Sequence, residues 1–291
     1  MRKAYRAFSK AVEAGEKDTV KKILDNPGTP FTVNDSDRFG RTALMSSSNK
    51  GHIGIVRMLL EYKADVTLFD NQNRTAVMDA AMGGQPEIIL LLVREFGADV
   101  TRRNKYGATA VHYGAHQGHV QTVKVLVEQC GADVNARDND GDTALILASR
   151  WNRPEATRCL LEKGADLNIR GRGNRTALEW AVARGCHVCA GIIIEFETKR
   201  LGRVLSRDCG EINMLHPQIL DATIGTIRSS GQKDAVKRIG SAVVPSSSSS
   251  SSSIVPPTDS NENQQRKRTG GLLNNDDDVA AGSKRARSSD P

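Results

Sequence analysis

Residues 138–168 read "DNDGDTALILASRWNRPEATRCLLEKGADLN", and the rest of the chain is best interpreted from this stretch. Its Thr143-Ala144 pair recurs along the chain at intervals of 33 or 34 residues, and its Ala165-Asp166 pair recurs in step. Several units in one register indicate an internal repeat rather than chance similarity. The threonines that begin the five units are Thr42, Thr75, Thr109, Thr143 and Thr176.

Each unit predicts a turn, a helix, a tight turn and a second helix. A glycine or asparagine stands two residues before each threonine, and these residue types tolerate positive φ, so a turn tip is expected there. The first helix carries small side chains at helical spacing, such as Leu145, Ala148 and Ser149. A second glycine or asparagine ends that helix. Pro86 and Pro154 then fall in the first turn of the second helix, where proline is tolerated.

The residue that closes the second helix is a glycine in three units, at Gly97, Gly131 and Gly164. Lys63 stands at the equivalent place in the first full unit. We expect a positive φ at this position, which glycine adopts without cost and lysine does not. The sequence therefore predicts local backbone strain at Lys63.

This pattern resembles the ankyrin repeat family. Residues 104–135, "NKYGATAVHYGAHQGHVQTVKVLVEQCGADVN", match the family's turn, its Thr-x-Leu-His-type helix start and its Gly-Ala-Asp-Val-Asn end. The family's proline after threonine is alanine here, and one unit keeps the histidine, as His112 after Thr109. The resemblance implies a hydrogen bond between these two side chains. It also implies an all-α fold, an ankyrin-repeat solenoid of stacked helix-turn-helix units.

The repeat pattern divides the chain into four parts. Residues 1–36 are expected to form a divergent N-terminal capping repeat, and residues 37–200 to form five ankyrin repeats. Residues 201–244 contain scattered apolar positions, which predict either a C-terminal cap or a weakly helical segment. Residues 245–291 are rich in serine and basic residues, and we expect them to be disordered, because they bury too little apolar surface to offset the entropy of ordering.

Composition limits the class of protein. The 291 residues carry a net charge of +7, which is compatible with acidic partners or with nucleic acid. Five cysteines at irregular spacing do not indicate a disulfide framework and favour a reducing compartment. The N-terminus has no hydrophobic signal region, and no apolar run is long enough for a membrane span.

Three short motifs that could carry chemistry are explained better by the repeat. The "CHVC" at residues 186–189 is half of a metal site, but both cysteines fall where the repeat expects a second helix. The "GRGNRT" at residues 171–176 is the last turn tip rather than a phosphate loop. Among the neighbouring histidines, His112 and His119 start helices, and His116 is expected to point outward. We therefore predict no catalytic site, no metal and no cofactor.

The expected binding surface is a concave groove. By the resemblance, partner contacts come from the turn tips and from the ends of the first helices. Basic residues outnumber acidic ones at these positions, and arginine and aromatic side chains dominate binding hot spots. The predicted partner-binding residues are Arg38, Phe39, Arg41, Lys50, Arg74, Lys105, Tyr106, His116, Arg150, Trp151, Arg172, Arg175 and Arg184.

The two tryptophans are expected to differ. At about 100° per residue, Trp151 lies at the border of the apolar stripe of its helix or outside it. Trp180 is adjacent to the core positions Leu178 and Ala181 and is expected to pack between repeats. Trp151 is therefore predicted to contact a partner.

The tail carries two basic clusters, "RKR" and "KRAR", which are typical of a nuclear localisation signal. The serine tract at residues 246–253 is a candidate for phosphorylation. The predicted localisation residues are Arg266, Lys267, Arg268, Lys284, Arg285 and Arg287.

Taken together, the sequence predicts a monomeric, non-catalytic adaptor in the nucleus, or in the nucleus and cytoplasm. It is expected to bind an acidic protein segment through the basic and aromatic groove. One alternative is direct nucleic-acid binding by the same basic face, although its aromatic residues are too sparse for a single-strand stacking platform. A cytoplasmic scaffold or substrate-receptor protein is the other alternative.

Overall fold

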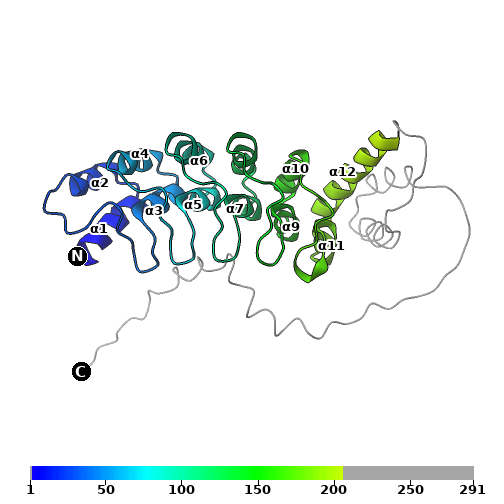
Figure 1. Ribbon diagram of the computed structural model, residues 1–291, viewed down its shortest axis with the longest axis horizontal. Coiled ribbons are helices and arrows are strands. Elements are labelled where there is room, and N and C mark those ends of the chain that lie inside the picture. The colour runs from blue at the N-terminus through cyan, green and yellow to red at the C-terminus, as the bar shows by residue number, and fades with distance from the viewer. Residues whose placement is uncertain (1, 206–291) are drawn as a thin grey trace, which may run out of the picture. The chain divides into compact units, whose positions relative to one another are not determined.

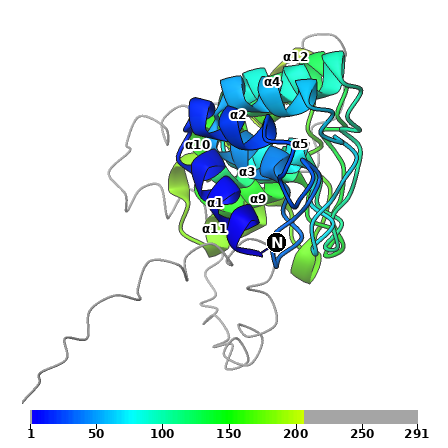
Figure 2. The same cartoon turned by 90° about the vertical axis from the view of Figure 1, so that its left-hand side faces the viewer.

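The computed structural model describes residues 2–205, which form a stack of helix pairs (Figure 1). The first helices of the pairs lie side by side in one row, and the second helices lie in a row beside them (Figure 1). Viewed from the N-terminal end, the connecting turns project to one side of both rows (Figure 2). This confirms the expected all-α ankyrin solenoid. The segments predicted to be a cap and a disordered tail lie, from residue 206 onward, outside the described residues.

The helices follow the units predicted from the sequence. The first helices are α1 (Arg2–Glu13), α3 (Ala43–Lys50), α5 (Ala76–Met82), α7 (Ala110–Gln117), α9 (Ala144–Arg150) and α11 (Ala177–Ala183). The second helices are α2 (Lys17–Leu24), α4 (Ile53–Glu61), α6 (Pro86–Leu90) continued by η1 (Leu91–Glu95), α8 (Val120–Lys124) continued by η2 (Val125–Gln129), α10 (Pro154–Glu162) and α12 (His187–Leu205). A single turn of 3-10 helix, η3 (Arg172–Asn174), forms the last turn tip. Helix α12 runs past residue 200, so the expected end of the repeats falls inside a helix.

The threonine of each unit starts the first helix. The Thr143 hydroxyl accepts a hydrogen bond from the amide of Ile146 at 3.4 Å, which satisfies one of the free amides at the helix start. Thr42, Thr75 and Thr176 do the same in their own units. In the remaining unit the expected pair is present, because Thr109 Oγ1 lies 3.0 Å from His112 Nδ1.

The turn tips take the backbone conformation that the sequence predicts. Gly141 has φ +80° and Asn73 has φ +61°. A side-chain oxygen braces the first four hairpins: Asp70 Oδ1, for example, accepts hydrogen bonds from the amides of Gln72 and Arg74, both at 2.8 Å. The tips are also joined to each other, since the Lys105 amide donates to the Gln72 carbonyl at 2.9 Å. The turns therefore form a continuous ladder that holds their side chains in fixed positions.

Two repeats contain one residue more than the others, and the structure shows where it goes. In the 33-residue unit that begins at Thr42, the Ala64 amide closes helix α4 by donating to the Leu59 carbonyl. In the 34-residue unit that begins at Thr75, the Ala98 amide donates to the Leu92 carbonyl, one residue further back. The extra residue is absorbed by the wider π-helical turn η1, and η2 does the same in the next unit.

Lys63 has φ +66°, the left-handed conformation expected from its place in the repeat. The two cysteines of "CHVC" lie in an apolar cluster with Ala181 and Ala190, as the repeat register predicts. Lys63 therefore reverses the chain after α4, and the two cysteines pack in the core of the last unit.

Candidate functional site

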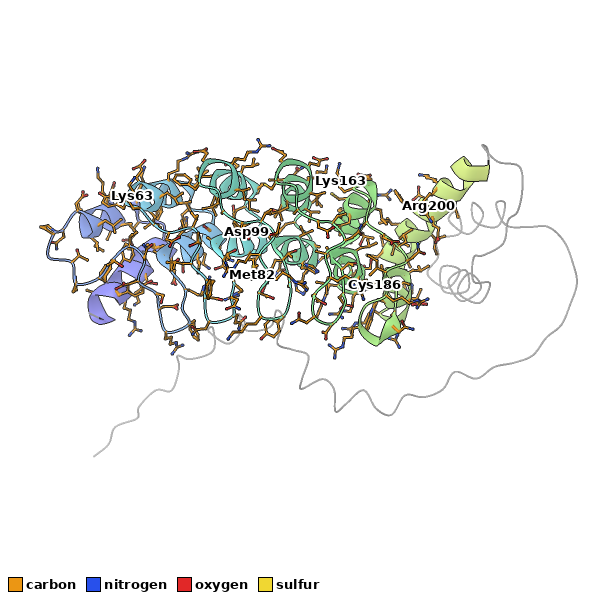
Figure 3. The ribbon with its side chains drawn as sticks, viewed as in Figure 1. Lys63, Met82, Asp99, Lys163, Cys186 and Arg200 are labelled. Carbon is orange, nitrogen blue, oxygen red and sulfur yellow. The ribbon has the colours of Figure 1, made fainter. Side chains whose placement is uncertain are left out.

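The surface predicted to bind partners consists of the turn tips and the ends of the first helices, and we call it the tip face. Met82, at the end of α5, marks it in Figure 3, while Lys63 and Lys163 lie on the opposite, second-helix side. Ion pairs join tip to helix end, as between Asp142 and Arg150, whose Oδ2 and Nη1 atoms are 2.9 Å apart. The tip face is therefore held together by contacts within and between repeats.

The N-terminal part of the tip face presents separate basic and aromatic side chains. Phe39 is 53% exposed, and the Arg38 guanidinium carbon lies 4.4 Å from the centre of its ring. Lys50 and Lys105 are exposed, and Tyr106 is partly exposed. These five side chains are accessible to a partner.

Three of the predicted arginines are partly buried in ion pairs. Arg74 Nε lies 2.8 Å from the carboxylate of Asp70, and an Arg41 nitrogen lies 3.6 Å from the fully buried carboxylate of Asp79. Arg150 pairs with Asp142 as described above. Removing one member would leave a buried charge uncompensated, so these arginines stabilise the turns as well as adding to the charge of the face.

The C-terminal part of the tip face contains both tryptophans. Trp180 lies between two guanidinium groups, with the Arg150 carbon at 5.1 Å and the Arg175 carbon at 5.0 Å from its ring centre. Trp151 is 37% exposed, and the Arg184 guanidinium carbon lies 5.8 Å from its ring. All three separations are within the range of cation–π attraction. We call these five residues the tryptophan cluster.

Arg172 completes the charged surroundings of this cluster. Its guanidinium lies 3.7 Å from the Asp140 carboxylate, and its amide donates to Asp142 Oδ1 at 2.8 Å. Burial raises the pKa of the Asp142 carboxyl group, although Arg150 opposes that effect. Burial also lowers the pKa of Arg150.

Comparison with known proteins agrees with this architecture. The family model for ankyrin repeats (3 copies) matches residues 8–104 and 111–201. The chain belongs to the ankyrin-repeat family. Proteins built from ankyrin repeats are generally non-catalytic modules that bind other proteins.

Individual ankyrin-repeat relatives match parts of the chain. It is 33% identical over 89 residues to "Notch-regulated ankyrin repeat-containing protein A" of Danio rerio, a match that covers 30% of this chain and 80% of the relative. The Homo sapiens "Notch-regulated ankyrin repeat-containing protein" is also 33% identical over 89 residues, covering 30% of this chain and 78% of the relative. The crystal structure of the ankyrin repeat protein EF0377 matches with a TM-score of 0.57 and 27% identity, over 65% of this chain and 96% of that chain.

One predicted binding residue of this ankyrin-repeat protein does not point outward. His116 is only 8% exposed, because Trp151 of the next repeat covers it with ring centres 4.9 Å apart. Burial, assisted by the positive charges of Arg153 and Arg150, lowers the pKa of His116 to about 4. The expectation of an exposed His116 was wrong, since the repeat register does not reveal which side chain a neighbouring ankyrin unit places above it.

Trp180 is the residue of the tip face that the sequence interpretation missed. It was expected to pack between ankyrin units, but it is partly exposed and contacts arginines from two of them. It occupies the fourth position after Thr176, where Ser46, Asp79, Tyr113 and Leu147 lie in the earlier units. Two of these side chains contact residues of the turn tips, Asp79 through Arg41 and Tyr113 through Asn104, and their polarity was a signal that this position faces the tips.

The remaining features are metal sites, membrane-spanning helices and the basic clusters of the tail. Within residues 2–205, no group of histidine, cysteine and acidic residues is placed so that it could hold a metal ion. No helix of this part of the chain is long and apolar enough to cross a membrane. The predicted localisation residues, Arg266 to Arg268 and Lys284 to Arg287, lie outside the described residues.

Proposed function

We propose that this ankyrin-repeat protein is a nuclear, non-catalytic adaptor that binds an acidic segment of a partner protein on its tip face. The observation that carries the proposal is the exposure of aromatic and basic side chains together on this face, from Phe39 at one end to Trp151 and Arg184 at the other. Arginine forks bind carboxylates with two parallel hydrogen bonds, and exposed rings contact apolar side chains. An extended acidic segment would meet both kinds of group along the ladder of turns.

Affinity capture from cell extract tests the proposal. The triple variant Phe39→Ala, Tyr106→Ala, Trp151→Ala should lose the proteins that the wild-type chain recovers. The matched control is Arg57→Ala, which removes an exposed side chain from the opposite, second-helix side. Recovery of the same partners by the triple variant and by wild type would contradict binding on the tip face.

The nuclear part of the proposal depends on the two basic clusters of the tail. Clusters of lysine and arginine are typical of nuclear localisation signals, which transport receptors recognise. Neutralising Arg266 to Arg268 together with Lys284, Arg285 and Arg287 should move a fluorescently tagged protein from the nucleus to the cytoplasm. An unchanged distribution would contradict the proposed nuclear localisation and would favour a cytoplasmic scaffold protein instead.

Direct nucleic-acid binding is the second candidate, and the exposed basic residues of the tip face favour it. Binding that neutralises phosphates weakens steeply as salt rises, with a linear slope of log affinity against log salt concentration. Titration of single- and double-stranded DNA and RNA at several salt concentrations separates the candidates. A steep slope with micromolar or tighter affinity would replace the protein partner with nucleic acid.

A further inference from the structure

The tryptophan cluster contains buried hydrogen-bonding atoms that have no partner. Within the described residues these atoms are Nε1 of Trp180 and Nε of Arg150, and both ring nitrogens of the adjoining His116 also lack a partner. His116 is more than nine-tenths buried, and its ring packs against Trp151 at the edge of the cluster. Buried tryptophan N–H groups usually find an acceptor, and leaving such a group unpaired costs free energy. Trp180 Nε1 and Arg150 Nε are both donors, so the cluster is short of hydrogen-bond acceptors.

The cluster is also short of negative charge. Asp142 is already engaged by Arg150 and by the Arg172 amide, and Asp140 by the Arg172 guanidinium. Arg175 and Arg184 form no salt bridge within residues 2–205, although both lie over tryptophan rings.

We infer that the tryptophan cluster is the recognition site for a carboxylate of an extended acidic peptide, with an apolar neighbour of that residue resting on Trp151. The carboxylate oxygens would accept from Trp180 Nε1 and from the free N–H groups of Arg175 and Arg184. This inference rests on the proposed function and narrows it to the last two units.

The acidic residues already present favour a carboxylate over a phosphoryl group. Asp140 and Asp142 lie beside the cluster and offset part of its positive charge. A phosphoryl group carries nearly two negative charges and three strong acceptor oxygens, so these aspartates would repel it more than they repel a single carboxylate. The apolar neighbour is argued from Trp151, whose ring remains 37% exposed beside the charged groups.

The chain is well suited to a direct test, because it has two tryptophans and both belong to the cluster. Intrinsic fluorescence and the two indole N–H signals in an NMR spectrum of the full chain therefore report on this site. The probe is a synthetic nonapeptide of alternating glutamate and leucine. Control peptides replace the glutamates by glutamine or by phosphoserine. We expect a saturable fluorescence change with the glutamate peptide, a downfield shift of the Trp180 indole proton, and about tenfold weaker binding of the glutamine peptide.

Three variants and a matched control locate the binding. Arg175→Gln and Arg184→Gln should each weaken binding of the glutamate peptide about tenfold. Arg57→Gln is the control, since Arg57 lies in the second helix α4, away from the tip face, and it should leave binding unchanged. Trp180→Phe keeps the ring and removes the unpaired N–H. It should weaken binding while leaving the Tm unchanged or higher, an outcome that a purely structural tryptophan would not give.

The outcomes separate this inference from the broader proposal. If the acidic peptide binds but the loss appears in Lys50→Gln or Phe39→Ala and not in the cluster variants, the adaptor proposal stands and the site assignment is overturned. Equal binding of the glutamine peptide would overturn recognition of a carboxylate. Tighter binding of the phosphoserine peptide would reassign the site to phosphorylated segments. If none of the peptides binds and the triple variant of the tip face still captures all partners, both fail.

Discussion

At the scale of single residues, His116 and Lys63 are each held in conditions that their own chemistry disfavours. His116 buries two ring nitrogens that have no hydrogen-bond partner within residues 2–205. Lys63 holds a backbone angle that suits glycine. Each has a counterpart at the same place in another unit, Met82 for His116 and Gly97 for Lys63. The repeats therefore supply their own reference residues for measuring these costs.

Replacing His116 by methionine should raise the free energy of unfolding at neutral pH by about 1 kcal/mol, because an unpaired buried polar ring is exchanged for an apolar chain. Urea unfolding of wild type and variant at pH 7 measures this change. Arg153→Met is a contrasting variant, because its Nε donates to the His116 carbonyl at 2.8 Å. That variant should be less stable than wild type. A destabilised His116→Met would contradict the reading of His116 as a strained, unpartnered group.

The same histidine should also give a pH dependence. Burial lowers the pKa of both His112 and His116 to about 4 in the folded chain, below the ordinary value of about 6.5. The unfolded chain therefore binds protons first as pH falls, and stability is lost between about pH 6.5 and pH 4. His116→Met should lose about 2 kcal/mol less than wild type between pH 7 and pH 4.5. Parallel pH profiles for the two proteins would argue against a buried neutral His116.

Lys63→Gly should stabilise the chain by about 0.5–1 kcal/mol, because glycine adopts φ +66° without steric cost. The matched control is Gly97→Ala, at φ +67°, where an added Cβ meets no other atom within 4 Å. That change should destabilise by a similar amount through the backbone alone. Thermal unfolding of both variants checks the pair, and a lower Tm for Lys63→Gly would overturn the argument.

At the scale of helices, the π-helical turns η1 and η2 show how the stack tolerates a change of repeat length. The added residue lies between the second helix and its closing glycine, where it widens the last turn. The core residues before it, such as Leu91 and Leu92, remain buried. The insertion is accepted because it lies after the last core side chains of the helix and leaves the next turn in place.

Deleting Phe96 should therefore convert η1 to α-helix and change stability by no more than about 1 kcal/mol, because Phe96 is one of the exposed side chains. Deleting Glu61 from the 33-residue unit is the control, since α4 has no extra residue to lose. We expect that deletion to cost at least about 3 kcal/mol, because it pulls core leucines out of place. Urea unfolding and backbone NMR chemical shifts of residues 86–98 provide the measurements. An equal decrease in the free energy of unfolding for both deletions would show that η1 is not a tolerated insertion.

At the scale of the whole molecule, stability comes from contacts between neighbouring units. Each inner helix pair packs against a unit on both sides, whereas α1 and α2 have a neighbour on one side (Figure 1). Repeat proteins of this kind behave as a chain of units whose stability is the sum of unit and interface contributions. Central units should thus open less often than the first unit.

Native-state hydrogen exchange should show this gradient. Amides of α5, α7 and α9 should exchange most slowly, and those of α1 and α2 at least about tenfold faster, because the first unit frays before the centre. Mass spectrometry of exchanged fragments measures the rates on the full chain. Uniform protection from α1 to α9 would instead indicate that the stack unfolds as one cooperative block.

What the sequence by itself determined is local to one unit. The start of each first helix at its threonine, the turn tips, the left-handed angles at Lys63 and Asn152, and the prolines that begin α6 and α10 all follow from residues a few positions apart. Such features depend on backbone preference and capping, which a repeated pattern displays directly. The all-α ankyrin architecture then follows because the units can bury their apolar faces only against each other.

The tertiary structure decided which outward positions are accessible. His116 is covered by a ring 35 residues further along the chain, and Trp180 is drawn to the tip face by Arg150, 30 residues before it. Arg41 is held by Asp79 from the next unit. These arrangements depend on side chains that meet only after the units stack, so no pattern within one repeat could specify them.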